Sequence, residues 1–193
     1  MATATTTVLK TYFNTGDKPT QQNFHDQLES YLNVTDGGTV AGATNFTGAV
    51  NLVKDYESIT AATKAVTAAD SGTVYGLNRA GGIAVTLPTP AAGVHYTFVI
   101  ETTFTTAGTI TTATTDGTDG FVGYLSLNDP TTAGDMNTFI PAASNDFIDL
   151  GQIEQGWLAG GVIKLTGLNT TTWLVEGHLI GDATLETPFQ DAA

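Results

Sequence analysis

The 193-residue chain contains no cysteine. Thiol catalysis, cysteine-ligated zinc and disulfide stapling are therefore excluded. The sequence also lacks an apolar run near the ~20 residues that a membrane helix needs, and its N-terminus has no basic stretch followed by an apolar one. We therefore expect no membrane span, no secretion signal and no membrane partner, and a fold that depends on an ordinary packed core.

Basic residues are scarce. Six lysines and arginines stand against 19 aspartates and glutamates, which gives a formal net charge of −13 at pH 7. A surface with this charge favours solubility and repels phosphate groups. Direct binding to nucleic acid is therefore not expected.

Threonine and glycine are abundant instead. Threonine is β-branched and favours strands, whereas glycine permits the tight turns between them. From about Ile59 onward, short segments rich in Val, Ile, Thr and aromatic residues are bounded by Gly, Pro, Asn or Asp, which is typical of strands and turns. The pattern predicts an all-β fold over residues 59–193, as an antiparallel sandwich or barrel. The expected strands are 73–77, 83–87, 94–101, 109–114, 121–127, 146–150, 162–168 and 172–180.

Two of these segments, 94–101 and 172–180, alternate with a period of two, so that large apolar side chains share one face. On several strands the opposite face is also apolar or only weakly polar. A sheet that is apolar on both faces in so small a protein indicates a subunit interface as well as a core. The residues that this pattern assigns to a trimer interface or to the core are Tyr96, Phe98, Trp173 and Val175.

Residues 81–100, GGIAVTLPTPAAGVHYTFVI, contain no Asp, Glu, Lys or Arg. Two prolines interrupt the segment before Gly93, and proline removes a donor from a strand ladder. We interpret the segment as two consecutive strands joined by PTPAAG. Because it is uncharged, we expect it to lie inside the sandwich or against a neighbouring copy.

One helical pattern, PTQQNFHDQLESYLN, follows an extended arm over residues 1–18. From Phe24 onward its apolar residues recur at i, i+4, i+7 and i+8, and Thr20 is suited to cap the helix. Turn signals flank the pattern on both sides, so we expect its apolar stripe to dock on another subunit or on an assembly. Residues 1–35 are thus predicted to form an attachment segment. Its expected contact residues are Tyr12, Phe13, Phe24, Leu28, Tyr31 and Leu32.

Residues 36–58 mix glycine with short Thr/Val/Phe alternations and are interpreted as a connector. Two readings are open. The segment forms short, narrow strands that several chains share around an axis, or it is a flexible linker.

The residue types that support catalysis or metal binding do not form a recognised pattern. His95 and His178 are imaginable as a metal pair but have no HxH or HExxH spacing, and Asp116 and Asp119 lie in a glycine-rich loop that lacks the EF-hand pattern. No phosphate-binding loop, dinucleotide fingerprint or nucleophile elbow is present. We therefore predict no enzyme, no cofactor and no metal.

A family resemblance lies in three segments: VTAADSGTVYGLNRAGGIAVTLPTPAAGVHYTFVIETTFTTAGTITTAT at 66–114, DFIDLGQIEQG, and the closing GGVIKLTGLNTTTWLVEGHLIG. Together they resemble the head decoration (cement) proteins of tailed bacteriophages. An AADSG opening, a TLP-P-AG hairpin, a long aromatic strand and a terminal W-V-G strand recur in that group. The resemblance implies a jelly-roll-like β-sandwich, trimeric on the outer capsid surface, and it brings no active site.

The N-terminal segment LKTYFNTGDKPTQQNFHDQLESYL resembles the leading segment of various phage structural proteins, including tail fibres. GATNFTGAV, within the connector, is similar to a fibre repeat. These likenesses depart from a plain decoration domain and are the basis of the tail-fibre alternative.

The expectation that follows is a structural virion protein that decorates and stabilises a bacteriophage capsid by binding between capsid subunits. It would act as a homotrimer on the outer capsid surface, with the major capsid protein as its partner. The alternative is a tail-fibre or receptor-binding adhesin that recognises host surface glycans, with Tyr124 or Trp157 in glycine-rich loops stacking on sugars. Trp157 suits a core or interface position equally well. A carbohydrate-active enzyme is disfavoured, because no acid–base constellation is visible.

Overall fold

The computed structural model describes residues 11, 16, 18–24, 55–114, 117–132, 135–182 and 184–191. The chain divides into two compact units, Met1–Asn51 and Leu52–Ala193, which we describe separately. In these described ranges, no helix is both long and apolar enough to cross a membrane.

In the first unit, residues 21–24 are helical. The Asn23 N–H donates to the Thr20 hydroxyl oxygen at 3.3 Å, and the Thr20 N–H donates to Asn23 Oδ1 at 2.8 Å. This reciprocal pair is a capping box, so the helix begins at the predicted N-cap. Phe24 is 49% exposed. The other expected contact residues, Tyr12, Phe13, Leu28, Tyr31 and Leu32, lie outside the described residues, and their role stays a prediction.

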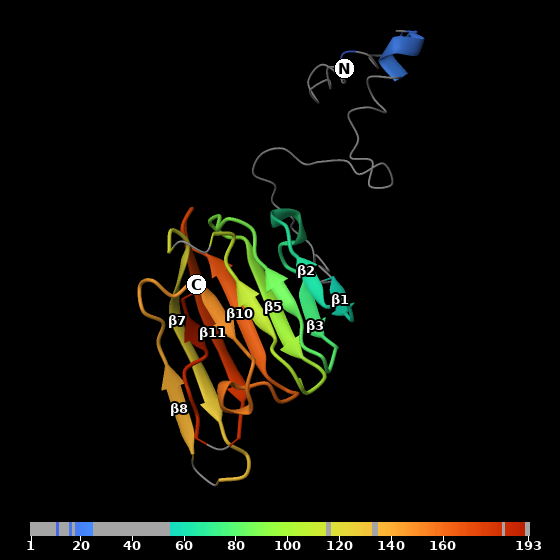
Figure 1. The fold of residues 1–193 in the computed structure, drawn as a ribbon. Helices are drawn as coiled ribbons and strands as arrows, with labels where there is room; N and C mark the ends of the chain where they lie inside the picture. The colour runs from blue at the N-terminus through green and yellow to red at the C-terminus, as the bar shows by residue number, and fades with distance from the viewer. Residues whose placement is uncertain are drawn as a thin grey trace. The chain divides into compact units, whose positions relative to one another are not determined.

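The second unit is an all-β sandwich, as the sequence predicts (Figure 1). One sheet has seven strands in the order β1-β3-β5-β10-β11-β7-β8, and the other has five in the order β12-β9-β6-β4-β2. Two short 3₁₀ helices, Ala68–Asp70 and Ile153–Gln155, lie between strands. The strands are β1 (Tyr56–Ile59), β2 (Thr63–Ala65), β3 (Val74–Leu77), β4 (Ala84–Thr86), β5 (His95–Ile100), β6 (Thr109–Thr111), β7 (Gly120–Asn128), β8 (Met136–Phe139), β9 (Phe147–Asp149), β10 (Val162–Gly167), β11 (Thr172–Ile180) and β12 (Phe189–Gln190).

The prediction that the sheets are antiparallel is wrong for much of the sandwich. β1, β3 and β5 pair in parallel, as do β2, β4 and β6, and β7 pairs in parallel with β11. The first six strands alternate between the two sheets, so each pass of the chain adds one strand to each sheet. Neighbours within a sheet are therefore alternate strands that run in the same direction. Antiparallel pairing is found at β5-β10-β11, β7-β8 and β6-β9-β12.

The uncharged segment 81–100 crosses from one sheet to the other. β4 belongs to the five-stranded sheet and β5 to the seven-stranded sheet, so these consecutive strands do not form the hairpin that the family resemblance implies. The prolines lie in the crossing between the layers. The buried residues of this segment, at most 2% exposed, are Ile83, Val85, Leu87, Tyr96, Phe98 and Ile100. The interior of one sandwich thus accounts for the lack of charge.

Tyr96, Phe98, Trp173 and Val175 are each at most 1% exposed within a single chain. The three aromatic rings among them form a cluster with Tyr75, in which the Phe98 ring stacks on Tyr75 at 5.4 Å and the Trp173 ring lies 5.8 Å from Tyr96. The sequence pattern assigns these residues either to a trimer interface or to the core. A place in the core of one chain accounts for their burial without a partner chain. Each such side chain contributes about 1.5–3 kcal/mol on burial.

The strand β1 begins at Tyr56, within the predicted connector, and the second compact unit begins at Leu52. Most of residues 36–58 lie outside the described residues, so the choice between narrow strands and a linker stays open there.

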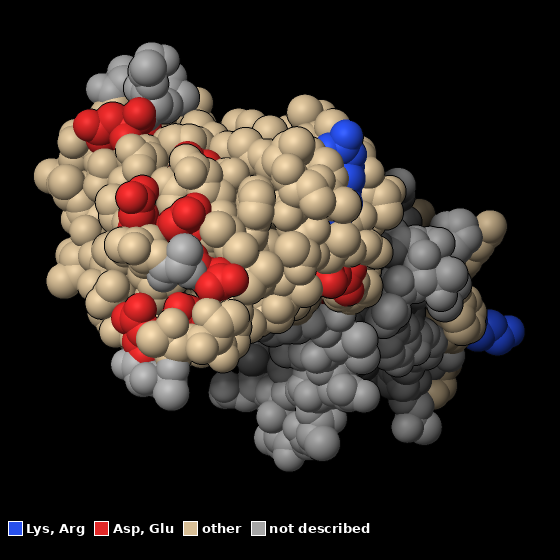
Figure 2. Space-filling model, turned by 60° about the horizontal axis from the view of Figure 1, so that its bottom comes forward, with Lys and Arg blue, Asp and Glu red and all other residues tan. Residues whose placement is uncertain are grey.

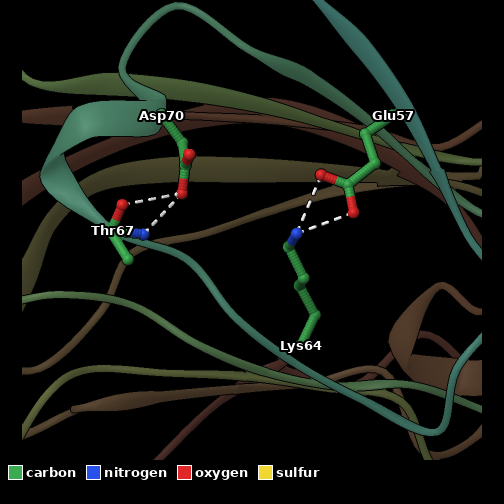
Figure 3. A network of polar contacts seen from close by, with 4 residues as sticks. All are labelled: Glu57, Lys64, Thr67 and Asp70. Atoms are coloured by element: carbon green, nitrogen blue, oxygen red, sulfur yellow. Dashed lines mark hydrogen bonds and ion pairs between the residues drawn. The ribbon is translucent and has the colours of Figure 1, made fainter.

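Charged residues join the two sheets at the edge formed by β1 and β2 (Figure 3). Lys64 Nζ on β2 lies 2.6 and 2.8 Å from the two carboxylate oxygens of Glu57 on β1, and 5.3 Å from the centre of the Tyr75 ring. Charge on an edge strand opposes pairing with a further chain. The stabilising effect of the ion pair is small, because both side chains are partly exposed.

Beside this pair, Asp70 caps the first 3₁₀ helix (Figure 3). The N–H and hydroxyl of Thr67 donate to Asp70 Oδ2 at 2.8 and 2.9 Å, and these bonds, the backbone one first, lower the pKa of Asp70. Because the folded pKa lies below the unfolded value, the carboxylate stabilises the fold above about pH 4 and this contribution is lost as pH falls through the folded pKa.

We expect Asp70→Ala to lower the free energy of unfolding by about 1 kcal/mol at pH 7, the usual effect of losing such a cap. The difference from the unsubstituted protein should shrink below the folded pKa, where the native carboxyl is protonated as well. Urea denaturation at neutral and strongly acidic pH measures this. Asp55→Ala, at an exposed position, is the control. An equal loss at both pH values would contradict the assignment.

Candidate functional site

The candidate site is an open depression of about 480 Å³ on the outward face of the seven-stranded sheet. It lies over β7, β11 and β10, which are neighbours in the sheet (Figure 1). The lining residues are Tyr124, Val162, Lys164, Glu176, Gly177 and His178.

Strand register brings the polar residues of this site together. Glu176 on β11 lies opposite Tyr124 on β7 and opposite Lys164 on β10, so the three form one row across the sheet. Side chains alternate along a strand, and the neighbours Leu125, Val175 and Leu165 are fully buried in the core. The residues of the row must therefore project outward.

The row combines an aromatic ring with two opposite charges. Tyr124 is 46% exposed, and Lys164 and Glu176 are also exposed. Lys164 and Glu176 lie directly opposite each other but form no ion pair within 4.0 Å. Among the described residues, the ion pair is the one between Glu57 and Lys64. His178 follows on the same face of β11. The site thus offers a ring face, an ammonium donor, a carboxylate acceptor and an imidazole, with charges that nearly cancel.

Gly123 lets β7 approach β11 closely beside Tyr124. Its φ of +117° lies in the left-handed half of backbone space, and a Cβ at this position would overlap the carbonyl oxygen of Val175. A side chain is therefore excluded on both counts. The sequence feature that could have indicated this close approach is a glycine in the middle of a strand of aromatic and aliphatic residues.

Of the two aromatic residues expected to stack on sugars, one is available. Trp157 is partly buried and packs against the core, whereas Tyr124 is exposed. Tyr124 lies within strand β7 and not in a loop, which corrects its expected setting. Lys164, Glu176 and His178 were missed as a group, because only the strand register brings them to Tyr124.

The residues considered for metal binding do not come together. His178 pairs with Val162 and His95 with Thr166, four residues apart along β10. Asp119 is buried and its N–H donates to the Thr114 hydroxyl, while Asp116 lies outside the described residues. Over the ranges that the structure describes, no group of three or more His, Asp or Glu residues could hold a metal ion.

Among the charged side chains of the described surface, acidic ones outnumber basic ones. On the face shown in Figure 2, Asp and Glu occur at several places, and Lys and Arg are sparse. This distribution follows from the overall charge of −13. A ligand of this surface is expected to be neutral or cationic.

Comparison of the chain with protein-family models, with curated proteins and with solved structures found no match. The structure is thus an all-β sandwich of two mixed sheets. An open depression, in which one positive and one negative charge nearly cancel, lies on one outward face.

Proposed function

We propose that the protein is a structural virion protein that decorates and stabilises a bacteriophage capsid by binding between capsid subunits. It acts as a homotrimer on the outer capsid surface, and its partner is the major capsid protein. The observation that supports this proposal best is the division of the chain into a short N-terminal unit and a sandwich with its own core.

The sandwich has a hydrophobic core of its own. The described core residues all lie between Ile59 and Phe189, and they come from both sheets. In this proposal, the apolar stripe that begins at the exposed Phe24 binds a capsid subunit.

The proposed mechanism is adhesive. Each aromatic or leucine side chain of the stripe that becomes fully buried contributes about 1.5–3 kcal/mol before ordering costs are subtracted. A trimer presents three such segments, and simultaneous binding raises the overall affinity without new kinds of contact. Modest contacts at each subunit therefore suffice to hold the capsid lattice together.

Charge is consistent with an outward location. At a net charge of −13 per chain, the protein is repelled by packaged DNA and remains well solvated on an outer surface. The sequence resemblance also implies a jelly-roll-like sandwich. The parallel pairs β1-β3-β5, β2-β4-β6 and β7-β11 depart from the antiparallel pairing of a standard jelly roll.

The test is removal of residues 1–35. We expect the shortened chain to keep the melting transition of the sandwich, because the second unit has its own core, and to lose cosedimentation with capsids that lack this protein. A second test keeps the full length and replaces Phe24, Leu28, Tyr31 and Leu32 by serine, which should also abolish cosedimentation. The matched control replaces the polar Gln21, Gln22 and Gln27 by alanine and should keep cosedimentation. Cosedimentation of the shortened chain at the full-length level would refute the proposal.

Copy number in purified particles separates the capsid role from the tail-fibre alternative. Near parity with the major capsid protein supports decoration, and a few copies per particle support a tail or vertex location. Sedimentation equilibrium at the same time tests the trimer, whose mass is three times the 20.0 kDa of one chain.

A further inference from the structure

The outward face of the seven-stranded sheet has chemistry that adhesion through the N-terminal unit does not use. Tyr124, Glu176 and Lys164 form one row across β7, β11 and β10 and line an open depression. None of the three contributes to the core, because alternate residues on each strand do so. We propose that this depression binds a neutral hexopyranose unit of a glycan. The inference goes beyond the capsid role and does not depend on it.

Tyr124 provides the stacking surface. Its ring is 46% exposed, and tyrosine combines a broad apolar face with a polar hydroxyl at its tip. One face of a pyranose ring is lined by C–H groups, which carry slight positive charge and pack on the negative face of an aromatic ring. Val162 adds an apolar contact on β10.

Glu176 and Lys164 provide the directional contacts. Directly opposite residues on neighbouring strands have Cβ atoms about 4.5–5.5 Å apart, which is comparable with the width of one sugar ring. A carboxylate accepts hydrogen bonds from two adjacent hydroxyls, and an ammonium donates to a third. His178, on the same face of β11, both donates and accepts when neutral.

Charge selects a neutral sugar. The ammonium of Lys164 and the carboxylate of Glu176 nearly cancel within the depression, and the chain as a whole has a charge of −13. Sialic acids, uronic acids and phosphorylated sugars meet net repulsion from such a surface. A neutral polyol instead offers a hydrogen-bond partner to both groups and adds no charge.

The openness of the site sets the expected affinity. One exposed ring and two or three hydrogen bonds on a shallow surface give a dissociation constant on the order of 1 mM for a single sugar. Several copies on one particle raise the avidity by roughly 10² or more. A weak site of this kind therefore suffices for attachment to a dense glycan layer.

Binding is tested with the full-length protein by ligand-observed NMR, with lactose, maltose, cellobiose and N-acetylchitobiose as neutral probes and sialyllactose as an anionic probe. We expect at least one neutral disaccharide to bind at millimolar concentration and sialyllactose to bind more weakly. Tyr124→Ala should reduce the affinity at least tenfold, Tyr124→Phe should retain most of it, and Glu176→Gln should reduce it several-fold. Tyr56→Ala is the matched control, because Tyr56 is the exposed tyrosine at the far edge of the same sheet.

Two results would overturn the assignment. In the first, none of the four neutral probes binds at millimolar concentration; if Tyr124→Ala then also changes the mass in sedimentation equilibrium, this face is an interface between copies. In the second, Tyr124→Ala binds the sugars as the unsubstituted protein does. Circular dichroism verifies that each variant is folded, and capsid cosedimentation, which uses the N-terminal unit, reports separately on the proposed function.

Discussion

Replacing Trp173 by alanine is expected to lower the free energy of unfolding by about 3–5 kcal/mol, the range for deleting a large aromatic side chain from a core. Trp173 lies on β11 and is completely buried, and its ring lies 5.8 Å from that of Tyr96. The cavity opens between the sheets, next to a strand that β10 and β7 hold on both sides, so collapse around it is difficult. Guanidinium denaturation followed by circular dichroism, at one fixed protein concentration, measures the loss.

Two control variants define the cause. Trp173→Phe keeps most of the ring volume and removes an indole N–H that has no hydrogen-bond partner among the described residues, so we expect it to lose clearly less than the alanine variant. Leu168→Ala, at a 47% exposed position, should change stability by less than about 0.5 kcal/mol. A loss below about 1 kcal/mol for Trp173→Ala would contradict its place in the core and favour the trimer-interface reading.

The interior strands were predictable because burial imposes a strong pattern on them. All eight expected strands are present, and in β5 the buried residues Tyr96, Phe98 and Ile100 alternate with less buried ones, as the period of two requires. The same alternation places Trp173 and Val175 in the core. Where both sides of a strand are paired, a slip of one residue would expose every core side chain, so the sequence is tightly constrained.

The four strands that the sequence did not reveal are β1, β2, β8 and β12, the outermost strands of the two sheets. β8 (MNTF) is mostly exposed, β12 has two residues, and β1 and β2 contain Glu57 and Lys64. Edge strands are kept short and polar because an apolar edge would pair with other chains. The properties that protect an edge are the same ones that remove the strand signal.

Strand direction and the candidate site were hidden for a related reason. Whether the residues after Leu87 turn back or cross to the other sheet depends on packing between the layers, and the prolines are compatible with both paths. The crossing makes β3 and β5 parallel neighbours. The row of Tyr124, Glu176 and Lys164 depends on the pairing of three strands that are far apart in the sequence, so composition alone could identify Tyr124 as a candidate but not its partners.

The second large effect is expected at Gly123, next to the candidate site. Gly123→Ala forces a side chain into a backbone conformation with φ of +117° and into overlap with the Val175 carbonyl oxygen. The strained conformation costs about 1–3 kcal/mol, and overpacking against a backbone atom adds about 1–3 kcal/mol. We therefore expect the free energy of unfolding to fall by roughly 2–6 kcal/mol, measured by urea denaturation at constant protein concentration.

Gly93→Ala separates the two contributions. Gly93 also has a positive φ, +86°, but a Cβ there meets nothing within 4 Å, so its replacement should produce the conformational loss alone. Equal losses at the two positions would mean that β7 shifts away from β11 at little cost and that the contact with Val175 does not matter. A clearly larger loss at Gly123 would mean that the backbone of β7 is fixed against β11, which is the geometry that holds Tyr124 in one row with Glu176 and Lys164.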